Sequence, residues 1–390
     1  MSHASARKKA PLVAIALMVK NEEVSIQATL YSMFKAGIHD FFILDTGSTD
    51  KTVEIALAFF KQHQLNGYLK QEAFVDFATS RNRTLELTKQ HFAHIPFVLM
   101  PDAEWFLRNG IELLSFCEQQ QHQDTPLYSL TIKMNELEFT VARLFRTNST
   151  IQFKGVVHEV PEIGTHFKVP DPVYFDVQAT YKGVEKTKKR WLQDLIMLTK
   201  VYETEPTDAR NTFYLAQTYH CLNDVENAFR FYQYRSQLQG WDEENFITLL
   251  RLGELATKAN QDNKLLAWAT AMDYYLKAHA LRPHRIEPLV QIADYYWPDN
   301  IQTCYLFASA AYKKPYPTND LLFINQDAYR YTRYEIMSRC AWYVGEFALG
   351  EEATLLALKA KPGTPHLLNN LKLYQDKLKN IEIKESMELT

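Results

Sequence analysis

The sequence lacks the features that mark membrane proteins and nucleic-acid-binding proteins. It has no run that approaches the roughly 20 apolar residues needed by a membrane-spanning helix. Its 43 Lys and Arg residues are outnumbered by 46 Asp and Glu residues, and its formal net charge is -3. Because such a chain has no basic field for a phosphate backbone, we expect no nucleic acid among its partners. We expect a cytoplasmic protein without a transmembrane segment.

Cysteine and glycine are both scarce. The four cysteines lie far apart and include no CxxC pair, which argues against a disulfide framework and a zinc site and indicates reduced core thiols. None of the 12 glycines belongs to a GxGxxG dinucleotide fingerprint or to a Walker A loop. A nucleotide phosphate would therefore have to be held by other groups.

The N-terminal stretch ARKKAPLVAIALMV has the outline of a secretory signal, because a basic segment precedes an apolar run. The apolar run is short, however, and it stops at KNEE without a small-residue cleavage pattern. These features favour a first buried strand over an export signal. We expect residues 1–10 to form a flexible N-terminus.

The first half of the chain alternates β-rich apolar runs with segments of helical period. At 390 residues, of which 46% are apolar, the chain is long enough for two or three domains. The expected strands are residues 12–19, 40–45, 67–74 and 97–101, and the expected helices are residues 22–37, 46–63 and 77–90. This alternation predicts βαβ units around a parallel, doubly wound sheet.

Acidic and basic side chains gather at the carboxyl ends of the expected strands. Ligands of such sheets bind at this edge, because loops and helix N-termini converge there. The side chains are Lys20, Asn21, Glu22 and Glu23 after the first strand, Asp45 at the end of the second, Arg81 and Asn82 in the third helix, and Asp102 and Glu104 after the fourth strand.

Asp102 and Glu104 can be interpreted in two ways. Both can point at one divalent ion, or one can bind a sugar hydroxyl while the other binds the ion, since Mg²⁺ and Mn²⁺ prefer oxygen ligands and phosphates. Alternatively, Asp102 caps the following helix and Glu104 is a solvated acid in its first turn. The stretch alone leaves both interpretations open.

The order and spacing of four motifs resemble the family 2 glycosyltransferases of the GT-A fold. The motifs are LMVKNEE, ILDTGSTDKT, FATSRN and LMPDAEWFL. The resemblance implies an α/β GT-A (Rossmann-like) domain that binds a nucleotide sugar. The metal-binding Asp-X-Asp of that family appears here as Asp102-Ala103-Glu104, which departs from the pattern at its third residue.

The resemblance also implies a role for each matching residue. Asn21, Glu22 and Asp45 would contact the nucleotide sugar, with Asp45 placed for the base, and Asp102 would bind the ribose. Arg81 and Asn82 would lie near the diphosphate or the sugar, where a guanidinium can fork onto phosphate oxygens. Mg²⁺ or Mn²⁺ would be the cofactor, and its ligands would be Asp102, Glu104 and His158.

Residues 136–162 show the period-two alternation of strands and contain His158-Glu159 in a GVVHE segment, which similar family members carry as G-x-x-H-E. His158 fits a metal or phosphate ligand, and its alternative is a core histidine at a strand end. An inverting transfer needs a general base for the acceptor nucleophile. Glu159 is the first candidate for this base, and Asp171 is the second.

The second half of the chain shows helical periodicity with a spacing near 34 residues. Pro283 and Pro317 stand 34 positions apart, and each follows an expected helix. Small and aromatic residues recur where tetratricopeptide repeats place their packing residues, namely Leu215, Ala216, Tyr219, Ala228 and Tyr232, and again Ala341, Ala353, Ala360 and Pro365. We therefore predict a GT-A domain over residues 11–182, an all-α tetratricopeptide-like helical solenoid over residues 183–380, and a polar tail over residues 381–390.

Three functions suit this organisation. The combination of the two domains resembles the bacterial peptide glycosyltransferases, which implies transfer of a sugar from a nucleotide donor, expected to be a UDP-sugar, to a protein or peptide acceptor held by the repeats. The alternatives are a glycosyltransferase for lipopolysaccharide or capsule glycans and an inactive adaptor that binds proteins through its repeats. The groove of a solenoid also suits self-association into a homodimer.

Overall fold

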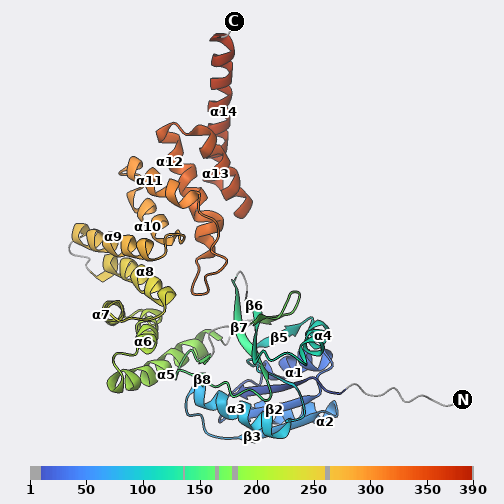
Figure 1. The fold of residues 1–390 in the computed structure, drawn as a ribbon. Coiled ribbons are helices and arrows are strands. Elements are labelled where there is room, and N and C mark those ends of the chain that lie inside the picture. Colours follow the sequence, from blue (N-terminus) through green and yellow to red (C-terminus); the bar gives the residue numbers. More distant parts are fainter. Residues whose placement is uncertain (1–9, 135–136, 163–166, 178–182, 260–263, 389–390) are drawn as a thin grey trace, which may run out of the picture. The chain divides into compact units, whose positions relative to one another are not determined.

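The computed structural model describes residues 10–134, 137–162, 167–177, 183–259 and 264–388. The chain divides into two compact units, Met1–Lys200 and Val201–Thr390 (Figure 1). The first is an α/β unit and the second is all-α, so the predicted fold class is confirmed. Helix α5 (Gly183–Thr204), which we expected to open the repeat domain, has most of its length in the first unit.

A nine-stranded mixed sheet forms the centre of the first unit, with the strand order β3-β2-β1-β4-β7-β6-β11-β5, and β10 pairs with β6 beside this path. Its first four strands are parallel, as predicted, and β4 then pairs with β7 in the antiparallel sense. The bounds are β1 Val13–Val19, β2 Asp40–Asp45, β3 Asn66–Gln71, β4 Phe97–Leu99, β5 Trp105–Arg108, β6 Leu127–Met134, β7 Leu137–Arg146, β10 Phe167–Lys168 and β11 Tyr174–Val177. A separate hairpin consists of β8 (Phe153–Lys154) and β9 (Val160–Pro161).

Helices cover both faces of the parallel part of the sheet. Alternate residues of β1 point to opposite faces. Ile15 and Leu17 pack in one core with α1 (Ile26–Lys35), α2 (Thr52–Gln62) and α4 (Gly110–Gln120). Ala14 and Ala16 face the other side, in the small cores that contain residues of α3 (Phe77–His91). Burial on both faces explains why β1 and β2 read as continuous apolar runs.

Local signals set the ends of these helices. The Asp76 side chain accepts a hydrogen bond from the Thr79 backbone N–H at 2.7 Å and so caps α3. Gly37 follows α1 with a φ of 89°, as expected for a C-terminal glycine. The first helical residue of α2 is Thr52, and its N-cap is Lys51.

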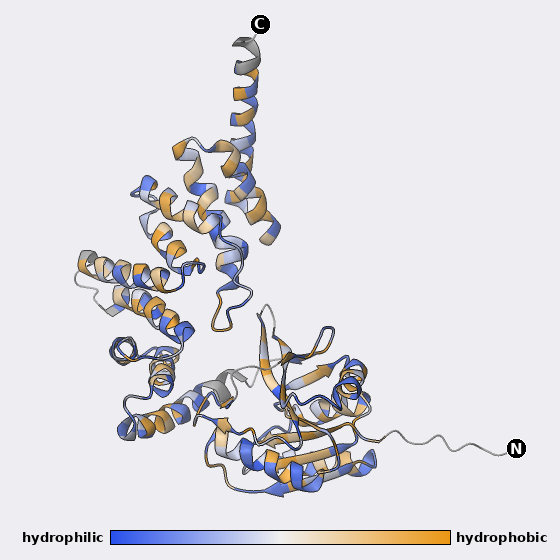
Figure 2. Cartoon of the chain, in the orientation of Figure 1, coloured by the Kyte–Doolittle hydropathy of each residue, from blue (hydrophilic) through white to orange (hydrophobic). Residues whose placement is uncertain are grey.

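The second unit is a series of helical hairpins. Neighbouring helices pair as α6 with α7, α8 with α9, α10 with α11 and α12 with α13, and α14 packs on α13. In Figure 2 these helices carry hydrophobic and hydrophilic stripes. Their bounds are α6 Ala209–Cys221, α7 Val225–Arg235, α8 Asp242–Ala259, α9 Lys264–Leu281, α10 Glu287–Tyr296, α11 Ile301–Tyr312, α12 Arg333–Cys340, α13 Phe347–Ala360 and α14 Pro365–Glu388, with the short turns η1 Ala328–Thr332 and η2 Ala341–Val344 beside α12.

Small residues let the paired helices approach closely, which is the packing that the repeat pattern predicts. A Cβ atom at Gly350 would lie 2.1 Å from the Tyr374 ring, and one at Gly253 would lie 2.4 Å from the Tyr275 ring. Of the nine predicted packing residues, Leu215, Ala216, Ala228, Tyr232, Ala341 and Ala353 are 0% exposed. Tyr219 is half-buried, and the prediction was wrong for Ala360 and Pro365, which are exposed near the end of α13 and the start of α14. The solenoid architecture is therefore confirmed.

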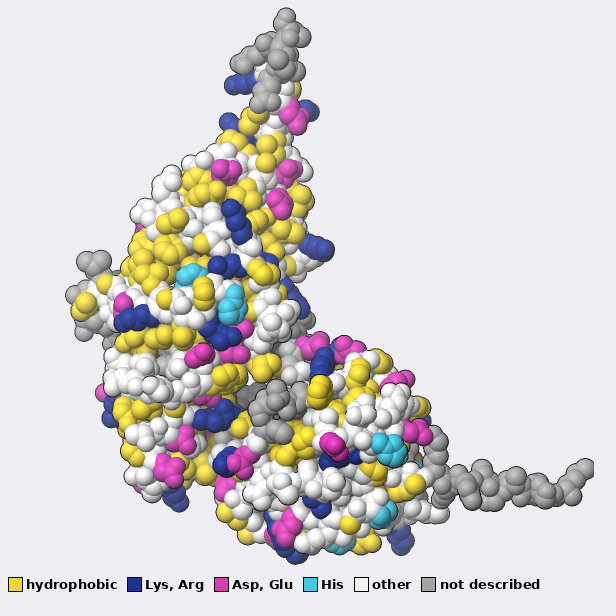
Figure 3. All heavy atoms as spheres, viewed as in Figure 1, with side chains coloured by type: hydrophobic (Ala, Val, Ile, Leu, Met, Phe, Trp, Pro, Cys, Tyr) yellow, Lys and Arg dark blue, Asp and Glu magenta, His cyan; other side chains and the backbone are white. Residues whose placement is uncertain are grey.

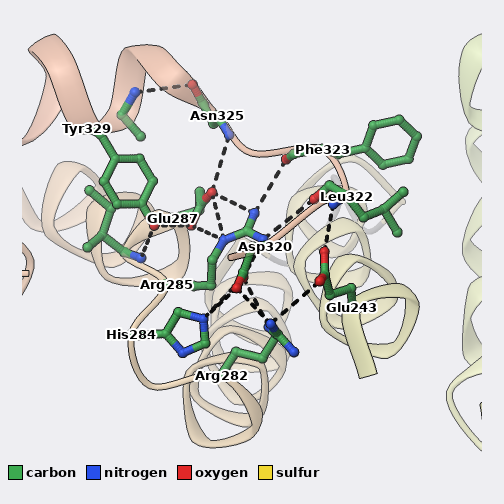
Figure 4. Close-up of polar contacts among 12 residues, drawn as sticks. Glu243, Arg282, His284, Arg285, Glu287, Asp320, Leu322, Phe323, Asn325 and Tyr329 are labelled. Carbon is green, nitrogen blue, oxygen red and sulfur yellow. Dashed lines mark hydrogen bonds and ion pairs between the residues drawn. The ribbon is translucent and has the colours of Figure 1, made fainter. Parts of the chain in front are cut away.

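A buried network of charges holds the long loop between α11 and η1 (Figure 4). Asp320 of this loop accepts hydrogen bonds from Arg282 at 2.8 Å, His284 at 2.9 Å and Arg285 at 3.2 Å. Glu287 binds the other side of Arg285, with a shortest distance of 2.7 Å. Glu243 accepts hydrogen bonds from the backbone of Leu321 at 2.7 Å and Leu322 at 2.6 Å. Side chains from α8, α10 and the turn between α9 and α10 thus fix the loop.

Several smaller expectations can be placed on the structure. The N-terminal residues 1–9 lie outside the described residues. Helix α14 runs to Glu388, through most of the segment that we expected to form a tail. All four cysteines are free. In the part of the chain that the structure describes, no helix is both long and apolar enough to cross a membrane.

Candidate functional site

The loops after β1 and β2 are hydrogen-bonded to each other at the carboxyl edge of the sheet. The Asn21 backbone donates to Ser48 Oγ at 2.9 Å, and the Asn21 side-chain oxygen accepts from the Thr49 backbone at 2.7 Å. The Glu22 backbone donates to Thr52 Oγ1 at 2.6 Å. The two motifs at these strand ends therefore form one interlocked rim, on which Asn21 is exposed and Glu22 is half-buried.

The buried carboxylate of Asp45 holds the loop after β2 in place. Asp45 is the last residue of β2 and is 0% exposed. Its carboxylate accepts hydrogen bonds from the Ser48 backbone N–H at 3.2 Å, from Ser48 Oγ, and from Gln71 Nε2 at 2.9 Å. Asp45 thus lies at the predicted edge of the sheet, and its described contacts hold the TGST loop.

A buried ion cluster occupies the next part of the same edge. Arg81 of α3 is 5% exposed, and its guanidinium donates to Asp102 Oδ1 at 2.6 Å and, through Nε, to Glu159. Asp102 follows β4, and its side chain is 38% exposed, so part of its carboxylate faces solvent. Three predicted site residues from three separate segments therefore meet in one place.

Arg143 of β7 joins this cluster, and the sequence motifs did not identify it. Its Nη2 donates to Glu159 at 3.3 Å, and its guanidinium carbon lies 5.2 Å from the centre of the Phe153 ring and 5.7 Å from that of the Trp105 ring. The signal that could have found Arg143 is a charged residue inside the apolar run Val141–Phe145. Such a residue has to be paired when the strand is buried.

Burial and charge shift the pKa values of these groups. Burial works against the charge of Arg81, but Asp102 and Glu159 more than compensate and raise its pKa. Burial also works against the charge of Asp102, yet Arg81 and Arg143 hold its pKa below the usual range. The pKa of Arg143 falls to about 10, because it is buried and lies beside the charge of Arg81. The carboxylate of Asp102 and the guanidinium of Arg81 therefore remain charged near neutral pH.

The hairpin between β8 and β9 positions Glu159. Gly155 and His158 in its turn have φ values of 100° and 53°. These values let the chain reverse direction within the turn, so that the two residues of β8 pair with the two residues of β9. The Phe77 backbone N–H at the start of α3 donates to the Val156 carbonyl at 3.2 Å and ties the turn to that helix. Glu159, whose side chain is 7% exposed, is thereby directed at Arg81.

The remaining predicted residues have other surroundings. Both polar groups of the Asn82 amide bind the backbone of Phe153, at 2.7 and 2.9 Å, and so fix strand β8 beside α3. Asp171 lies between β10 and β11 with 74% of its side chain exposed, and its ion-pair partner is Lys168 at 3.8 Å. Glu104 is half-buried and His158 is exposed.

The predicted metal ligands do not form a protein-only metal site. Among the described residues, no three His, Cys, Asp or Glu side chains come together in a way that could hold a metal ion. Asp102 also has Arg81 as its close partner. We therefore derive no chemical step through a resident metal, and Mg²⁺ or Mn²⁺ stays a prediction for the ligand-bound protein.

Helix α5 carries a buried carboxyl group, that of Asp194, which the motifs did not identify. Asp194 is 3% exposed and lies close enough to Glu159 for their charges to interact. Burial raises the pKa of Asp194 to about 6, with Arg190 lowering it and Glu159 raising it further. An aspartate at a buried helical position was the available signal, in the stretch KKRWLQDL.

Comparison with known proteins supports the resemblance to glycosyltransferases. No family model matches the chain. The chain is 22% identical over 228 residues to the SPbeta prophage-derived glycosyltransferase SunS of Bacillus subtilis (strain 168), and the same figures hold for glycosyltransferase SunS of Bacillus phage SPbeta. The match covers 57% of this chain and 52% of each relative, so the chain spans about half the length of the curated relatives it matches.

Solved structures of two kinds resemble the chain. S. aureus TarS 1-349, determined in complex with UDP-GlcNAc, is 15% identical over 78% of this chain and 93% of that chain, with a TM-score of 0.36. The tetratricopeptide-repeat protein YrrB is 15% identical over 47% of this chain and 84% of that chain, also with a TM-score of 0.36.

Proposed function

We propose that this protein is a glycosyltransferase that moves a sugar from a nucleotide donor, expected to be a UDP-sugar, to a protein or peptide acceptor. The observation that carries the proposal is the meeting of Arg81, Asp102 and Glu159 at the carboxyl edge of the parallel strands. Ligands of open α/β sheets bind at that edge. The sequence similarity to a glycosyltransferase over more than half of the chain supports the same activity.

Charge explains how this edge suits a nucleoside diphosphate. Arg81 and Arg143 place two guanidinium groups at the site, and guanidinium groups bind phosphate oxygens through paired N–H donors. They can neutralise the negative charge that develops on the diphosphate as it leaves the sugar. Asp102 stays ionised, and its exposed part can accept hydrogen bonds from ribose hydroxyls.

The transfer itself needs one proton acceptor. In an inverting reaction the acceptor atom forms a bond to the anomeric carbon, the bond from that carbon to the diphosphate breaks, and a base takes the proton of the acceptor atom. Glu159 remains our first candidate for this base and Asp171 the second. Glu159 would have to exchange part of its pairing with Arg81 and Arg143 for the acceptor proton.

The repeat unit is the proposed holder of the polypeptide acceptor. Its surface carries large exposed hydrophobic side chains, among them Leu306 at 64%, Leu321 at 61% and Tyr343 at 61%. Figure 3 shows hydrophobic side chains interspersed with charged ones on the visible face of this unit. These side chains could contact an apolar segment of a bound polypeptide.

Release of UDP from a panel of UDP-sugars tests the activity. We expect the protein to release UDP from at least one of them, slowly with water and faster with its acceptor. Glu159→Gln should leave donor binding nearly unchanged and lower sugar transfer by about 10²-fold or more. Full transfer by this variant would remove Glu159 from the role of base, and Asp171→Asn would be measured next. Failure to bind or cleave any sugar nucleotide would overturn the proposed function.

A further inference from the structure

A pocket lies among the last helices of the repeat unit. Its volume is about 160 Å³, and its lining includes Trp297 after α10, Arg339 of α12, Trp342 and Tyr343 of η2, and Asn370 and Tyr374 of α14. A cavity of about 150 Å³ holds one benzene ring, whereas sites for drug-sized ligands and cofactors measure about 300–1,000 Å³. The pocket therefore fits one aromatic or leucine-sized side chain and is too small for a nucleotide sugar.

Polar contacts within the protein hold the walls of this pocket. The Tyr374 hydroxyl donates to the Ser338 carbonyl at 2.9 Å, and the Asn370 amide donates to Ser338 Oγ at 3.1 Å. Arg339 Nη2 donates to Asp294 at 2.8 Å. Because these polar groups are already paired, the pocket is preformed and offers mainly apolar and aromatic surface to an occupant. An apolar group suits this surface better than a sugar, whose hydroxyl groups need hydrogen-bond partners.

Aromatic rings make up most of the surface that remains. The ring centres of Trp297 and Tyr343 lie 5.7 Å apart, and those of Trp342 and Tyr374 lie 5.5 Å apart. Tyr343 is 61% exposed, and Leu373, which also lines the pocket, is 46% exposed. Aromatic side chains in pockets supply much of the binding energy at polypeptide interfaces. The pocket is thus suited to an apolar side chain of a polypeptide.

The wall formed by Trp297 carries excess negative charge. Arg339, whose guanidinium carbon lies 5.3 Å from the centre of the Trp297 ring, pairs with two carboxylates, those of Asp294 and Glu335. The Asp294 side chain is 58% exposed. Lys377 adds a positive charge at the α14 wall instead. A basic side chain next to the apolar one would therefore find a complementary charge at Asp294.

We infer that this pocket anchors the polypeptide acceptor by taking one of its aromatic or leucine-sized side chains, with a neighbouring lysine or arginine of the acceptor facing Asp294. This inference rests on the proposed function. It names the sequence feature by which the repeat unit recognises the acceptor, which is an apolar residue with a basic neighbour. An acidic peptide would meet like charge at Asp294, and a sugar would find the polar groups of the walls already paired.

Titration of three blocked tripeptides into the full chain, followed by the NMR signals of the peptides, tests the inference. The peptides are acetyl-Lys-Phe-Lys-amide, acetyl-Lys-Ala-Lys-amide and acetyl-Glu-Phe-Glu-amide. The alanine peptide should bind about tenfold or more weakly than the first peptide, which is the effect of leaving one apolar side chain unburied. The glutamate peptide should bind about two- to fivefold more weakly than the first, because its charges lie at the exposed rim.

Two variants assign the binding to this pocket. Tyr343→Ala removes an exposed ring of the lining and should weaken binding of the first peptide about fivefold or more. Asp294→Asn should remove the preference for lysine over glutamate. Tyr31→Ala is the matched control, because Tyr31 is a 47% exposed tyrosine of α1 in the other unit, and it should bind the peptides like the wild type.

Titration of UDP into the same samples separates this inference from the proposed function. The variants should keep the wild-type affinity for UDP, because none of them changes the ion cluster of the α/β unit. Equal affinity of the wild type for the phenylalanine and alanine peptides, absence of binding by all three peptides, or unchanged binding by Tyr343→Ala would overturn the inference. Displacement of the first peptide by methyl glucoside would also overturn it and would assign the pocket to a sugar. Absence of UDP binding by the wild type would instead overturn the proposed function.

Discussion

Two of the buried clusters of arginines and carboxylates in the chain differ in how completely their polar atoms are paired. In the repeat unit, every nitrogen of the Arg285 guanidinium has an acceptor, and Asp320 receives hydrogen bonds from three side chains. In the α/β unit, Arg81, Arg143 and Asp194 each keep a buried polar atom without a partner among the described residues. Among the described residues, the first cluster supplies partners for all of these atoms and the second does not.

The difference separates structural charge from functional charge. A network in which all members are satisfied fixes one conformation of the chain, here the loop before η1. In a network with unpaired members, the buried unpaired atoms lower the stability of the fold, and a ligand that binds these atoms can restore it. Buried arginines alone are therefore weak evidence for a binding site, whereas unpaired buried donors beside a strand end are stronger evidence.

The largest expected effect concerns the complete cluster. Arg285→Met would leave Glu287 buried without its arginine partner and would remove one of the three side chains that donate to Asp320. Removing one member of a buried ion pair costs about 3–5 kcal/mol. Denaturant unfolding should show this loss in the transition of the repeat unit, while the affinity for UDP stays at the wild-type value. An unchanged unfolding midpoint would show that the network does not stabilise the unit.

A smaller effect of opposite sign is expected at Asp194. Its folded-state pKa is raised from 3.8 to about 6, so the folded protein disfavours the charged form. The resulting loss of stability is absent below about pH 4, develops as the pH rises, and is full above about pH 6, where it reaches up to about 3 kcal/mol. Asp194→Asn should therefore stabilise the α/β unit at pH 8 and have little effect at pH 4. Equal effects at both pH values would show that the carboxyl group is paired in the folded protein.

The expected effect of a metal ion is smaller still. Asp102 and Glu104 would lie beside the two phosphates of the proposed donor, and a divalent ion would reduce the repulsion between these groups. UDP affinity should rise about tenfold, or ~1.4 kcal/mol, when Mg²⁺ or Mn²⁺ is added. It should fall back to the value without the ion when a chelator removes the ion. Glu104→Gln should reduce this response. Equal UDP affinity with and without the ion would remove the metal from the proposal.

The sequence predicted most of the elements that build the edge of the sheet. The apolar runs of β1, β2 and β4 and the helices α1 and α3 were recognisable, because burial on two faces and capping leave strong local patterns. The positions of Asp45, Arg81 and Asp102 followed from the rule that parallel strands end at one edge. Local patterns suffice for residues that directly follow a strand.

Residues brought in by distant pairing could not be predicted in the same way. Arg143 reaches the site because β7 pairs in the antiparallel sense with β4, and α5 belongs to the first unit although the sequence placed it in the repeat domain. Neither relation leaves a periodic signal in the sequence. Asn82 stays a predicted ligand residue, and the contact of its amide with the backbone of Phe153 is visible only in three dimensions.

Titration of UDP into the wild-type protein and the variant Arg81→Lys tests the central claim most directly. Lysine keeps the charge beside Asp102 and Glu159 but loses the forked donors that bind two phosphate oxygens. We predict that the wild type binds UDP and that Arg81→Lys weakens it about ten- to hundredfold, the range for charge-assisted hydrogen bonds worth about 1.5–3 kcal/mol. The control Arg83→Lys changes an arginine of the same helix that pairs with Glu72, and it should bind like the wild type. Equal UDP affinity in wild type and Arg81→Lys would contradict the claim that this cluster is the nucleotide site.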